Sequence, residues 1–331
     1  MNGVKEKVLK ALRQKNKVFV SGEELSKSLG VSRTAVWKAI QALRAEGYGI
    51  FAQHRQGYCL ADVPDLLLPS EVGWGLETKW LGKEIYYNAT LSSTNDAAKE
   101  LARQGAREGT LVVTEEQTRG KGRRGRSWDS PYKQGLLFSV ILRPDLPPVQ
   151  APQLTLLAAV VLAETFRTEL RLPAKIKWPN DVYIGGRKVA GILTELSAEV
   201  DSINFIIMGI GINVNTNIEE LPLSLRNKVT SLKLEIGTKI ARVQLLQALL
   251  LKLEHFYTEY LRRGSGFVLD RWRQFALYLG QQVQVLTSHE NFVGKAIDID
   301  EYGALLVEVK PGVVRRVLAG DVSLRPESYE K

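Results

Sequence analysis

Residues 21–47 read SGEELSKSLGVSRTAVWKAIQALRAEG, and this stretch decides the fold of the first part of the chain. Ser21 and Glu24 have the S-x-x-E spacing of a capping box, which predicts a short helix that ends near Gly30. Ser32 follows that glycine and is placed to cap a second helix, so the stretch predicts a helix-turn-helix. The buried face of the second helix is expected to carry Val36, Ile40 and Leu43.

The residues on both sides of this stretch complete a small domain. Val4, Val8 and Leu12 recur every four residues, which predicts a preceding helix with one apolar stripe. Downstream, the short runs 50–52 and 58–60 enclose a polar turn and predict a hairpin. Three helices followed by such a wing resemble the winged helix-turn-helix family.

Positive charge is concentrated in this predicted domain. The formal net charge of the chain is +9, and residues 1–60 hold eleven basic and four acidic side chains. Localised positive charge predicts contact with a polyanion. The candidate DNA-binding residues on the second helix and the wing are Ser32, Arg33, Thr34, Lys38, Gln41, Arg44 and Arg55. Basic helical faces also occur on ordinary solvated surfaces, and small helix-turn-helix folds also serve as protein-binding modules, so that alternative stays open.

The composition is that of an ordinary globular protein. A length of 331 residues with 44% hydrophobic residues predicts two or three domains with their own cores. No run approaches the roughly 18 apolar residues that cross a bilayer, and the N-terminal residues lack a secretory signal pattern. The single cysteine, Cys59, excludes intrachain disulfides, and three histidines argue against a histidine-built metal site. We therefore expect a cytoplasmic protein without a membrane segment.

Beyond a linker with two prolines at residues 61–70, strands and helices alternate. The predicted strands cover residues 84–88, 110–116, 135–142, 174–177, 181–184, 189–196 and 205–214. The predicted helices cover residues 95–104, 154–170 and 242–263. This mixture predicts an α+β domain with a mixed sheet. Four closely spaced strands at residues 283–285, 292–299, 304–309 and 313–318 then predict a small antiparallel barrel.

A segment rich in glycine and arginine follows one of the predicted strands. Residues 117–128 read QTRGKGRRGRSW, with five cations between Arg119 and Arg126. Glycine lets the backbone approach a ligand closely, and arginine offers paired donors to phosphate. The spacing matches neither a P-loop nor a G-x-G-x-x-G motif. Its composition alone supports an RNA-binding tract as well as it supports a phosphate-binding loop.

Three further motifs carry polar residues at the ends of predicted elements. Residues 175–181 read KIKWPND, and a lysine held at this strand end could stabilise charge on a carboxylate or phosphoryl group, or could simply be a surface lysine beside a packed tryptophan. Residues 92–95, SSTN, could cap a helix or bind a polar head group. Residues 209–215, GIGINVN, could form a β-bulge or let a ligand lie against the strand.

In this order, SSTN, GKGRRGR, KWPND, RKVAGILTEL (residues 187–196) and GIGINVN resemble the biotin–protein ligase family over essentially the whole chain. With the N-terminal helix-turn-helix, the chain resembles the bifunctional form that also acts as a biotin-responsive repressor. Lipoate and octanoyl transfer enzymes share the central fold, but GKGRRGR together with KWPND favours biotin. One departure is Lys121, which stands where the family commonly has arginine.

The resemblance implies three domains. They are a winged helix-turn-helix at residues 1–65, a ligase domain like that of class II aminoacyl-tRNA synthetases at residues 66–270, and a small SH3-like β-barrel at residues 271–331. Residues 215–230 lie where members of this family cover the adenylate. The resemblance thus predicts an α+β protein whose first and last domains flank the catalytic one.

The resemblance also implies a reaction and its residues. Members of the family activate biotin with MgATP to biotinyl-5′-AMP and pass the biotinyl group to a lysine of a biotin carboxyl carrier domain. The implied catalytic residues are Lys177, which would bridge the carboxylate and the α-phosphate, and Arg123, which would retain the adenylate. The implied biotin-binding residues are Ser93, Thr94, Asn95, Gln117, Lys121, Gly122, Arg123 and Lys177. The implied nucleotide-binding residues are Arg123, Arg124, Arg126, Trp128, Lys177, Asn180 and Asn213. Asp181 is the candidate contact to Mg²⁺.

Regulation is implied by the resemblance as well. Biotinyl-5′-AMP would act as corepressor, favour a homodimer and bring it to a two-fold DNA operator, while unbiotinylated carrier domain would compete for the dimer surface. Two alternatives remain: a ligase with a non-regulatory N-terminal domain, and a biotin-sensing repressor without catalysis. Arg33, Lys38, Gln41 and Arg44 argue against the first, and Lys177, Arg123 and the basic loop argue against the second.

Overall fold

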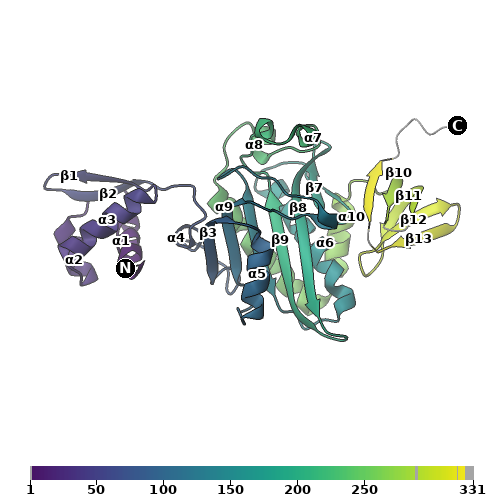
Figure 1. The fold of residues 1–331 in the computed structure, drawn as a ribbon, viewed down its shortest axis with the longest axis horizontal. Coiled ribbons are helices and arrows are strands. Elements are labelled where there is room, and N and C mark those ends of the chain that lie inside the picture. The colour runs from purple at the N-terminus through teal and green to yellow at the C-terminus, as the bar shows by residue number, and fades with distance from the viewer. Residues whose placement is uncertain (1, 288–289, 319, 325–331) are drawn as a thin grey trace. The chain divides into compact units, whose positions relative to one another are not determined.

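The structure is a computed structural model that describes residues 2–287, 290–318 and 320–324. It divides into two compact units, Met1–Leu66 and Leu67–Lys331, each with its own internal contacts. Figure 1 shows the helices and strands of both units, which are described separately below. The predicted division into three domains differs from these two units in number and stays a prediction.

The first unit is a three-helix domain with a hairpin. Its elements are α1 (Asn2–Gln14), α2 (Gly22–Leu29), α3 (Arg33–Ala45), β1 (Gly49–Gln53) and β2 (Gly57–Asp62). Ser21 Oγ accepts a hydrogen bond from Glu24 N at 3.0 Å, and Ser32 Oγ accepts one from Ala35 N at 3.1 Å, so both predicted N-caps form. Glu24 differs from a full capping box, because its carboxylate binds Lys15 Nζ at 2.9 Å. Gly30 ends α2 in the left-handed conformation with φ 65°, as the glycine predicted.

The second unit is built on a seven-stranded mixed sheet. Its strand order is β3-β4-β5-β9-β8-β7-β6, with β3 and β4 parallel and the other neighbouring strands antiparallel. The strands are β3 (Ile85–Leu91), β4 (Leu111–Gln117), β5 (Leu136–Leu142), β6 (Lys175–Lys177), β7 (Asp181–Ile184), β8 (Arg187–Ala198) and β9 (Ile203–Ile212). All seven coincide with predicted strands within a few residues, and the predicted α+β class with a mixed central sheet is confirmed.

Helices cover both faces of this sheet. The helices around it are α4 (Pro69–Val72), α5 (Thr94–Arg103), α6 (Ala151–Thr168), α7 (Leu223–Arg226), α8 (Leu232–Ile236) and α9 (Arg242–Arg263). Short 3₁₀ turns lie at Arg123–Gly125, Pro148–Gln150 and Ile218–Glu220. α5 lies on one face, while α6 and α9 lie on the other (Figure 1). Alternate side chains of β4 divide accordingly, because Val112 packs with α5 and Val113 belongs to the larger core.

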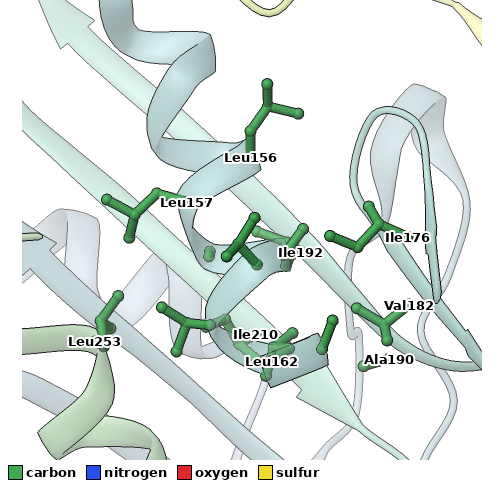
Figure 2. Packing of buried hydrophobic residues seen from close by; sticks show 14 of the residues in the cluster. Leu156, Leu157, Leu162, Ile176, Val182, Ala190, Ile192, Ile210 and Leu253 are labelled. Atoms are coloured by element: carbon green, nitrogen blue, oxygen red, sulfur yellow. The ribbon is translucent and has the colours of Figure 1, made fainter. Parts of the chain in front are cut away.

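The larger core is centred on α6. Leu157 and Leu162 of α6 belong to one apolar cluster with Ile192 and Ile210 of the sheet and Leu253 of α9 (Figure 2). Among the described residues, Pro148–Thr168 is the one helix whose length and composition would suit a membrane span, and 72% of its apolar window is buried inside the protein. Burial against the sheet accounts for its apolar composition.

The last part of the second unit is β-rich, as predicted. Its strands are β10 (Gln282–Leu286), β11 (Asn291–Ile299), β12 (Leu305–Lys310), β13 (Val313–Val317) and β14 (Asp321–Leu324), paired in the antiparallel order β13-β12-β11-β10-β14. Closure into an SH3-like barrel stays a prediction. In this part of the chain β14 and the helix α10 (Gly266–Phe275) were not predicted, and α10 contains the predicted boundary at residue 270; the short helices α4, α7 and α8 of the central part were not predicted either. Trp178 Nε1 donates to Gly303 O at 2.9 Å and ties this part to the central sheet.

Candidate functional site

A narrow pocket opens where α5 begins beside β4 and β9. Thr94 donates to Gln117 Oε1 from its backbone N at 2.7 Å and from its hydroxyl at 3.1 Å, so helix start and strand end are joined. Ser139 Oγ lies 2.8 Å from Thr94 Oγ1 and 2.7 Å from Asn95 Oδ1. The structure thus brings Thr94, Asn95 and Gln117 of the predicted biotin site into one pocket wall, together with Ser93.

Ser93 and Asn95 are buried and already hydrogen-bonded. Ser93 is the N-cap of α5, and its Oγ accepts from Asp96 N at 3.5 Å. Asn95 Nδ2 donates to Leu193 O at 3.1 Å and to Glu195 Oε2 at 2.8 Å. Thr94 is as buried as these two residues and Gln117 is partly buried, so all four belong to one hydrogen-bonded pocket wall.

The glycines of β9 make room for neighbouring side chains. A Cβ atom at Gly209 would overlap with Asn95 Oδ1, and one at Gly211 would lie 2.6 Å from the Trp128 ring. Neither glycine has a positive φ, so space rather than backbone freedom requires glycine at both positions. The pocket is about 50 Å³, well below the roughly 300 Å³ of small ligand sites, so a ligand of that size must displace Trp128 or other residues of its loop.

Gly211 lines the narrow pocket, so Gly211→Ala is expected to place a methyl group in the biotin site, against the Trp128 ring, and to raise the KM for biotin by about 10-fold, the cost of roughly 1.4 kcal/mol of strain. Initial rates of biotin transfer at varied biotin check this. The melting temperature should change little, because Trp128 is on a loop; Gly209→Ala, which overlaps buried Asn95, should lower it instead. A Gly211→Ala enzyme with unchanged KM would contradict the role of this contact.

The basic loop lies over this pocket and beside a second, wider cleft. Arg123 lines both cavities, and its Nη1 donates to Asn180 Oδ1 at 3.1 Å. The Arg123 side chain is half-buried, and this burial lowers the pKa of its guanidinium. Lys121 and Gly122 also line the narrow pocket, with Lys121 Nζ 2.6 Å from Asp96 Oδ1.

The other two predicted arginines of the loop turn toward the β-rich part. Arg124 has a left-handed φ of 56°, and its Nη1 donates to Leu286 O at 3.1 Å. Arg126 forms an ion pair with Asp321 and lines the wider cleft. Arg124 therefore lies outside the cavities in this conformation, and its contact with a nucleotide stays a prediction.

The wider cleft gathers cations at the end of β6 and β7. Lys177 Nζ donates to the Tyr183 hydroxyl at 3.3 Å, and burial lowers the pKa of Lys177. Trp128, Asn180 and Asn213 also line this cleft of about 380 Å³. Trp128 Nε1 and Asn213 Oδ1 are buried without a hydrogen-bond partner in the described part of the chain, which leaves a donor and an acceptor for a ligand.

Sequence reasoning missed Lys188. This residue of β8 lines both cavities, whereas Lys177 lines only the wider cleft. Its Nζ lies 2.7 Å from Asp181 Oδ1 and 5.4 Å from the centre of the Trp128 ring. The RKVAGILTEL motif contained the residue, but only the antiparallel pairing of β7 with β8 brings it to the junction of the cavities.

The predicted metal contact, Asp181, is engaged with Lys188. The described residues contain no group of three or more His, Cys, Asp or Glu side chains that could hold a metal ion. One carboxylate already paired with an ammonium group does not make a resident Mg²⁺ site, since Mg²⁺ prefers several oxygen ligands in octahedral geometry. The metal role of Asp181 stays a prediction.

The predicted DNA-binding residues lie mainly on the exposed side of α3 and on the hairpin. Ser32, Arg33, Thr34, Lys38, Gln41 and Arg55 are exposed. Arg44, which was predicted on that exposed face, is half-buried, and its guanidinium donates to Ile50 O at 2.9 and 2.6 Å. Its position near the end of α3 lets it fasten the helix to the hairpin.

Comparisons with known proteins agree with this arrangement. Residues 87–213 match the "Biotin/lipoate A/B protein ligase family", residues 4–59 match an "HTH domain", and residues 278–325 match a "Biotin protein ligase C terminal domain". The biotin protein ligase of Aquifex aeolicus, solved with biotin and ATP, is 30% identical and superposes with a TM-score of 0.63, covering 73% of this chain and 99% of that one.

Two relatives match nearly the whole chain. The bifunctional ligase/repressor BirA of Bacillus spizizenii is 41% identical over 97% of this chain and 98% of its own length. The protein of the same name from Escherichia coli is 32% identical over 94% of both chains. The predicted resemblance is therefore confirmed: the chain belongs to the biotin–protein ligase family, and it combines the ligase domain of that family with an N-terminal helix-turn-helix domain.

Proposed function

We propose that this chain is a bifunctional biotin–protein ligase and biotin-responsive repressor. Arg123, Lys177 and Lys188 carry the enzymatic part, because they bring three cations to one cleft beside the narrow pocket of Thr94 and Gln117. The cleft has a volume of about 380 Å³ against about 50 Å³ for the pocket, so it suits an anion that is larger than the group held in the pocket. Biotin in the pocket and the phosphates of ATP in the cleft fit this division.

The proposed reaction has two steps and uses no protein nucleophile. A biotin carboxylate oxygen attacks the α-phosphorus of ATP, the bond to the β-phosphate oxygen breaks, and pyrophosphate leaves with that electron pair. The acceptor lysine amine, after loss of a proton, then attacks the acyl carbon of biotinyl-5′-AMP, and AMP leaves. The protein supplies positioning, charge stabilisation and exclusion of water from the mixed anhydride.

On the biotin side, the Thr94 hydroxyl and the Gln117 amide would bind the polar head, while Ser93 and Asn95 would support the wall. Lys121 and Gly122 would close over biotin with the basic loop. The junction position of Lys188 supports a role for this residue at the carboxylate and the α-phosphate, beside the predicted one for Lys177.

On the nucleotide side, Arg123 and Lys177 would bind the phosphates, with Arg126 at the cleft edge. Trp128 Nε1 and Asn213 Oδ1 would offer their unused donor and acceptor, and Asn180 already orients Arg123. The segment after β9 supports the predicted cover, since Leu221, Leu225 and Lys228 line the same cleft. Mg²⁺ would enter with ATP as part of the substrate, with the phosphates as its main ligands.

The regulatory part rests on the N-terminal unit. Biotinyl-5′-AMP, the product of the first step, would act as corepressor and favour a homodimer that binds two operator half-sites. The acceptor would be the carrier domain of a biotin-dependent carboxylase, and the chain would meet both partners in the cytoplasm. The exposed cations of α3 and the hairpin support DNA as the ligand of this unit.

Arg33→Gln and Lys38→Gln are each expected to weaken operator binding by about 10-fold. Each should also reduce the slope of the logarithm of the binding constant against the logarithm of the salt concentration by roughly 1, the effect of losing one phosphate contact. DNA binding by the full chain at several salt concentrations checks this. Biotin transfer should be unchanged, because both residues belong to the separate first unit. If biotin transfer falls together with DNA binding, the DNA-binding surface does not lie at Arg33 and Lys38.

One experiment tests the whole proposal. The full chain is incubated with labelled biotin, MgATP and a carboxyl carrier domain, and the sample is then tested for a DNA shift and for sedimentation with and without biotinyl-5′-AMP. Label on the carrier lysine together with an adenylate-dependent dimer and shift supports both functions. Label on the carrier without a DNA shift would mean that the chain is a ligase with a non-regulatory N-terminal domain. A DNA shift without label on the carrier would mean that it is a biotin-sensing repressor without catalysis.

A further inference from the structure

Trp37 is an exposed indole on the helix proposed to enter DNA. It lies on α3 four residues after Arg33 and four before Gln41, so the three side chains form one stripe. Of its surface, 52% is exposed, although the unit has an apolar core that includes Val36 and Ile40 from the same helix. An indole that the core does not use is available to a ligand.

Trp37 lines a hollow between α3 and the hairpin. Arg33 and Thr34 of the helix and Gln53, His54 and Arg55 of the hairpin turn line the same hollow. Its one acidic side chain is Glu23, which is paired with Lys27 at 2.7 Å. In the described part of the chain neither Arg33 nor Arg55 forms an ion pair. An apolar ring thus lines the same hollow as two cations that can bind phosphate.

Charge selects DNA as the occupant of the hollow. The two arginines and the excess of basic over acidic residues in positions 1–60 complement a polyanion. The major groove offers one apolar group to a helix, the C5-methyl of thymine, and apolar side chains recognise thymine through it. Contacts of cations with phosphates hold DNA without distinguishing its sequence.

We propose that Trp37 reads the C5-methyl group of a thymine in the operator, with Arg33 and Arg55 on the flanking phosphates. This inference rests on the proposed DNA binding and adds its recognition chemistry. Each half-site of a two-fold operator would then hold one thymine whose methyl group matters more than its hydrogen-bonding groups. Uracil differs from thymine only by this methyl group, so it isolates the contact.

The test uses the full chain with biotin and MgATP. Duplexes are selected from a random DNA pool, and each thymine of the selected site is replaced in turn by deoxyuridine. For the wild-type chain, uracil at one position per half-site is expected to weaken binding by about 3- to 10-fold, and at the other positions to have little effect. Trp37→Ala should bind thymine and uracil duplexes equally and more weakly, and Trp37→Phe should keep part of the discrimination.

Phe51→Ala is the matched control, because Phe51 of β1 is 63% exposed and lies outside the hollow. It should keep the full discrimination between thymine and uracil. Circular dichroism and the thermal unfolding of the full chain confirm that the N-terminal unit of each variant is folded, because biotin transfer depends on the other unit. Equal uracil effects in Trp37→Ala and wild type would overturn the inference while leaving DNA binding intact. A wild-type chain that selects no duplex would instead overturn the proposed repressor function and this inference with it. A change of oligomeric state in Trp37→Ala without a change in discrimination would overturn it in favour of a protein interface.

Discussion

Lys188→Ala and Lys177→Ala are each expected to slow biotinyl-5′-AMP formation by roughly 10²- to 10³-fold, the usual effect of removing one group that stabilises developing charge. The two variants should differ in their KM for biotin. Lys188 lines the narrow pocket as well as the cleft, so its loss should also raise the KM for biotin. Lys177 lines only the cleft, so its loss should leave the KM for biotin near its wild-type value. Biotin-dependent exchange of pyrophosphate into ATP measures both parameters.

Lys175→Ala is the control for these variants, because Lys175 lies on the same strand as Lys177 and lines neither cavity. Its exchange rate should equal that of the wild type. An unchanged rate in Lys177→Ala would remove Lys177 from the mechanism and leave Lys188 as the bridging cation. Unchanged rates in both alanine variants would contradict the proposed cleft chemistry as a whole.

The same lysine gives the reaction a pH dependence. Burial lowers the pKa of Lys177, so this amine loses its proton at a lower pH than an exposed lysine does. The charged form is the one that stabilises the phosphate, and the exchange rate should therefore fall on the alkaline side below the usual pKa of lysine. Lys177→Arg, which keeps its charge over this range, should shift that fall to higher pH.

Local sequence signals were sufficient for most elements of the fold. The serine caps and Gly30 set the ends of α2 and α3 through contacts within a few residues, and short runs rich in apolar residues marked the seven strands of the central sheet. The order of those strands was not predictable, because it depends on pairing between distant segments. The four-residue β14 was missed for the same reason, since it pairs with β10. The helix α10 begins two residues after Gly264, the C-cap of α9, and no side-chain cap marks its start.

In the candidate site, too, positions that depend on pairing between distant segments could not be predicted. Motifs of adjacent residues identified Thr94, Gln117, Arg123 and Lys177, which the fold brings to two neighbouring cavities. Lys188 gained its position only from the pairing of β7 and β8. Periodicity placed Arg44 on the exposed face of its helix, but a long side chain near a helix end can reach back, and it binds Ile50 O. A helical pattern gives the direction of the Cβ atom and leaves the end of the side chain undetermined.

Arg123→Gly is expected to release biotinyl-5′-AMP from the enzyme about 10- to 100-fold faster, because a hydrogen bond to a charged group contributes about 1.5–3 kcal/mol. Arg123 lines both cavities and donates to Asn180, so in the proposed complex it would lie beside the bond between biotin and AMP. Burial lowers its pKa, and the same weak solvation strengthens its contact with a phosphate. The first step should continue, since Lys177 and Lys188 remain.

Labelling of a bystander protein measures the release. With biotin, MgATP and serum albumin, the Arg123→Gly enzyme should biotinylate albumin lysines, because free biotinyl-5′-AMP acylates any exposed amine it meets. Arg119→Gly is the matched control: it removes the same charge from the same loop, but Arg119 is exposed and lines neither cavity, so labelling should stay confined to the carrier domain. Strict carrier specificity in the Arg123→Gly enzyme, with adenylate formation intact, would show that other residues of the loop retain the intermediate.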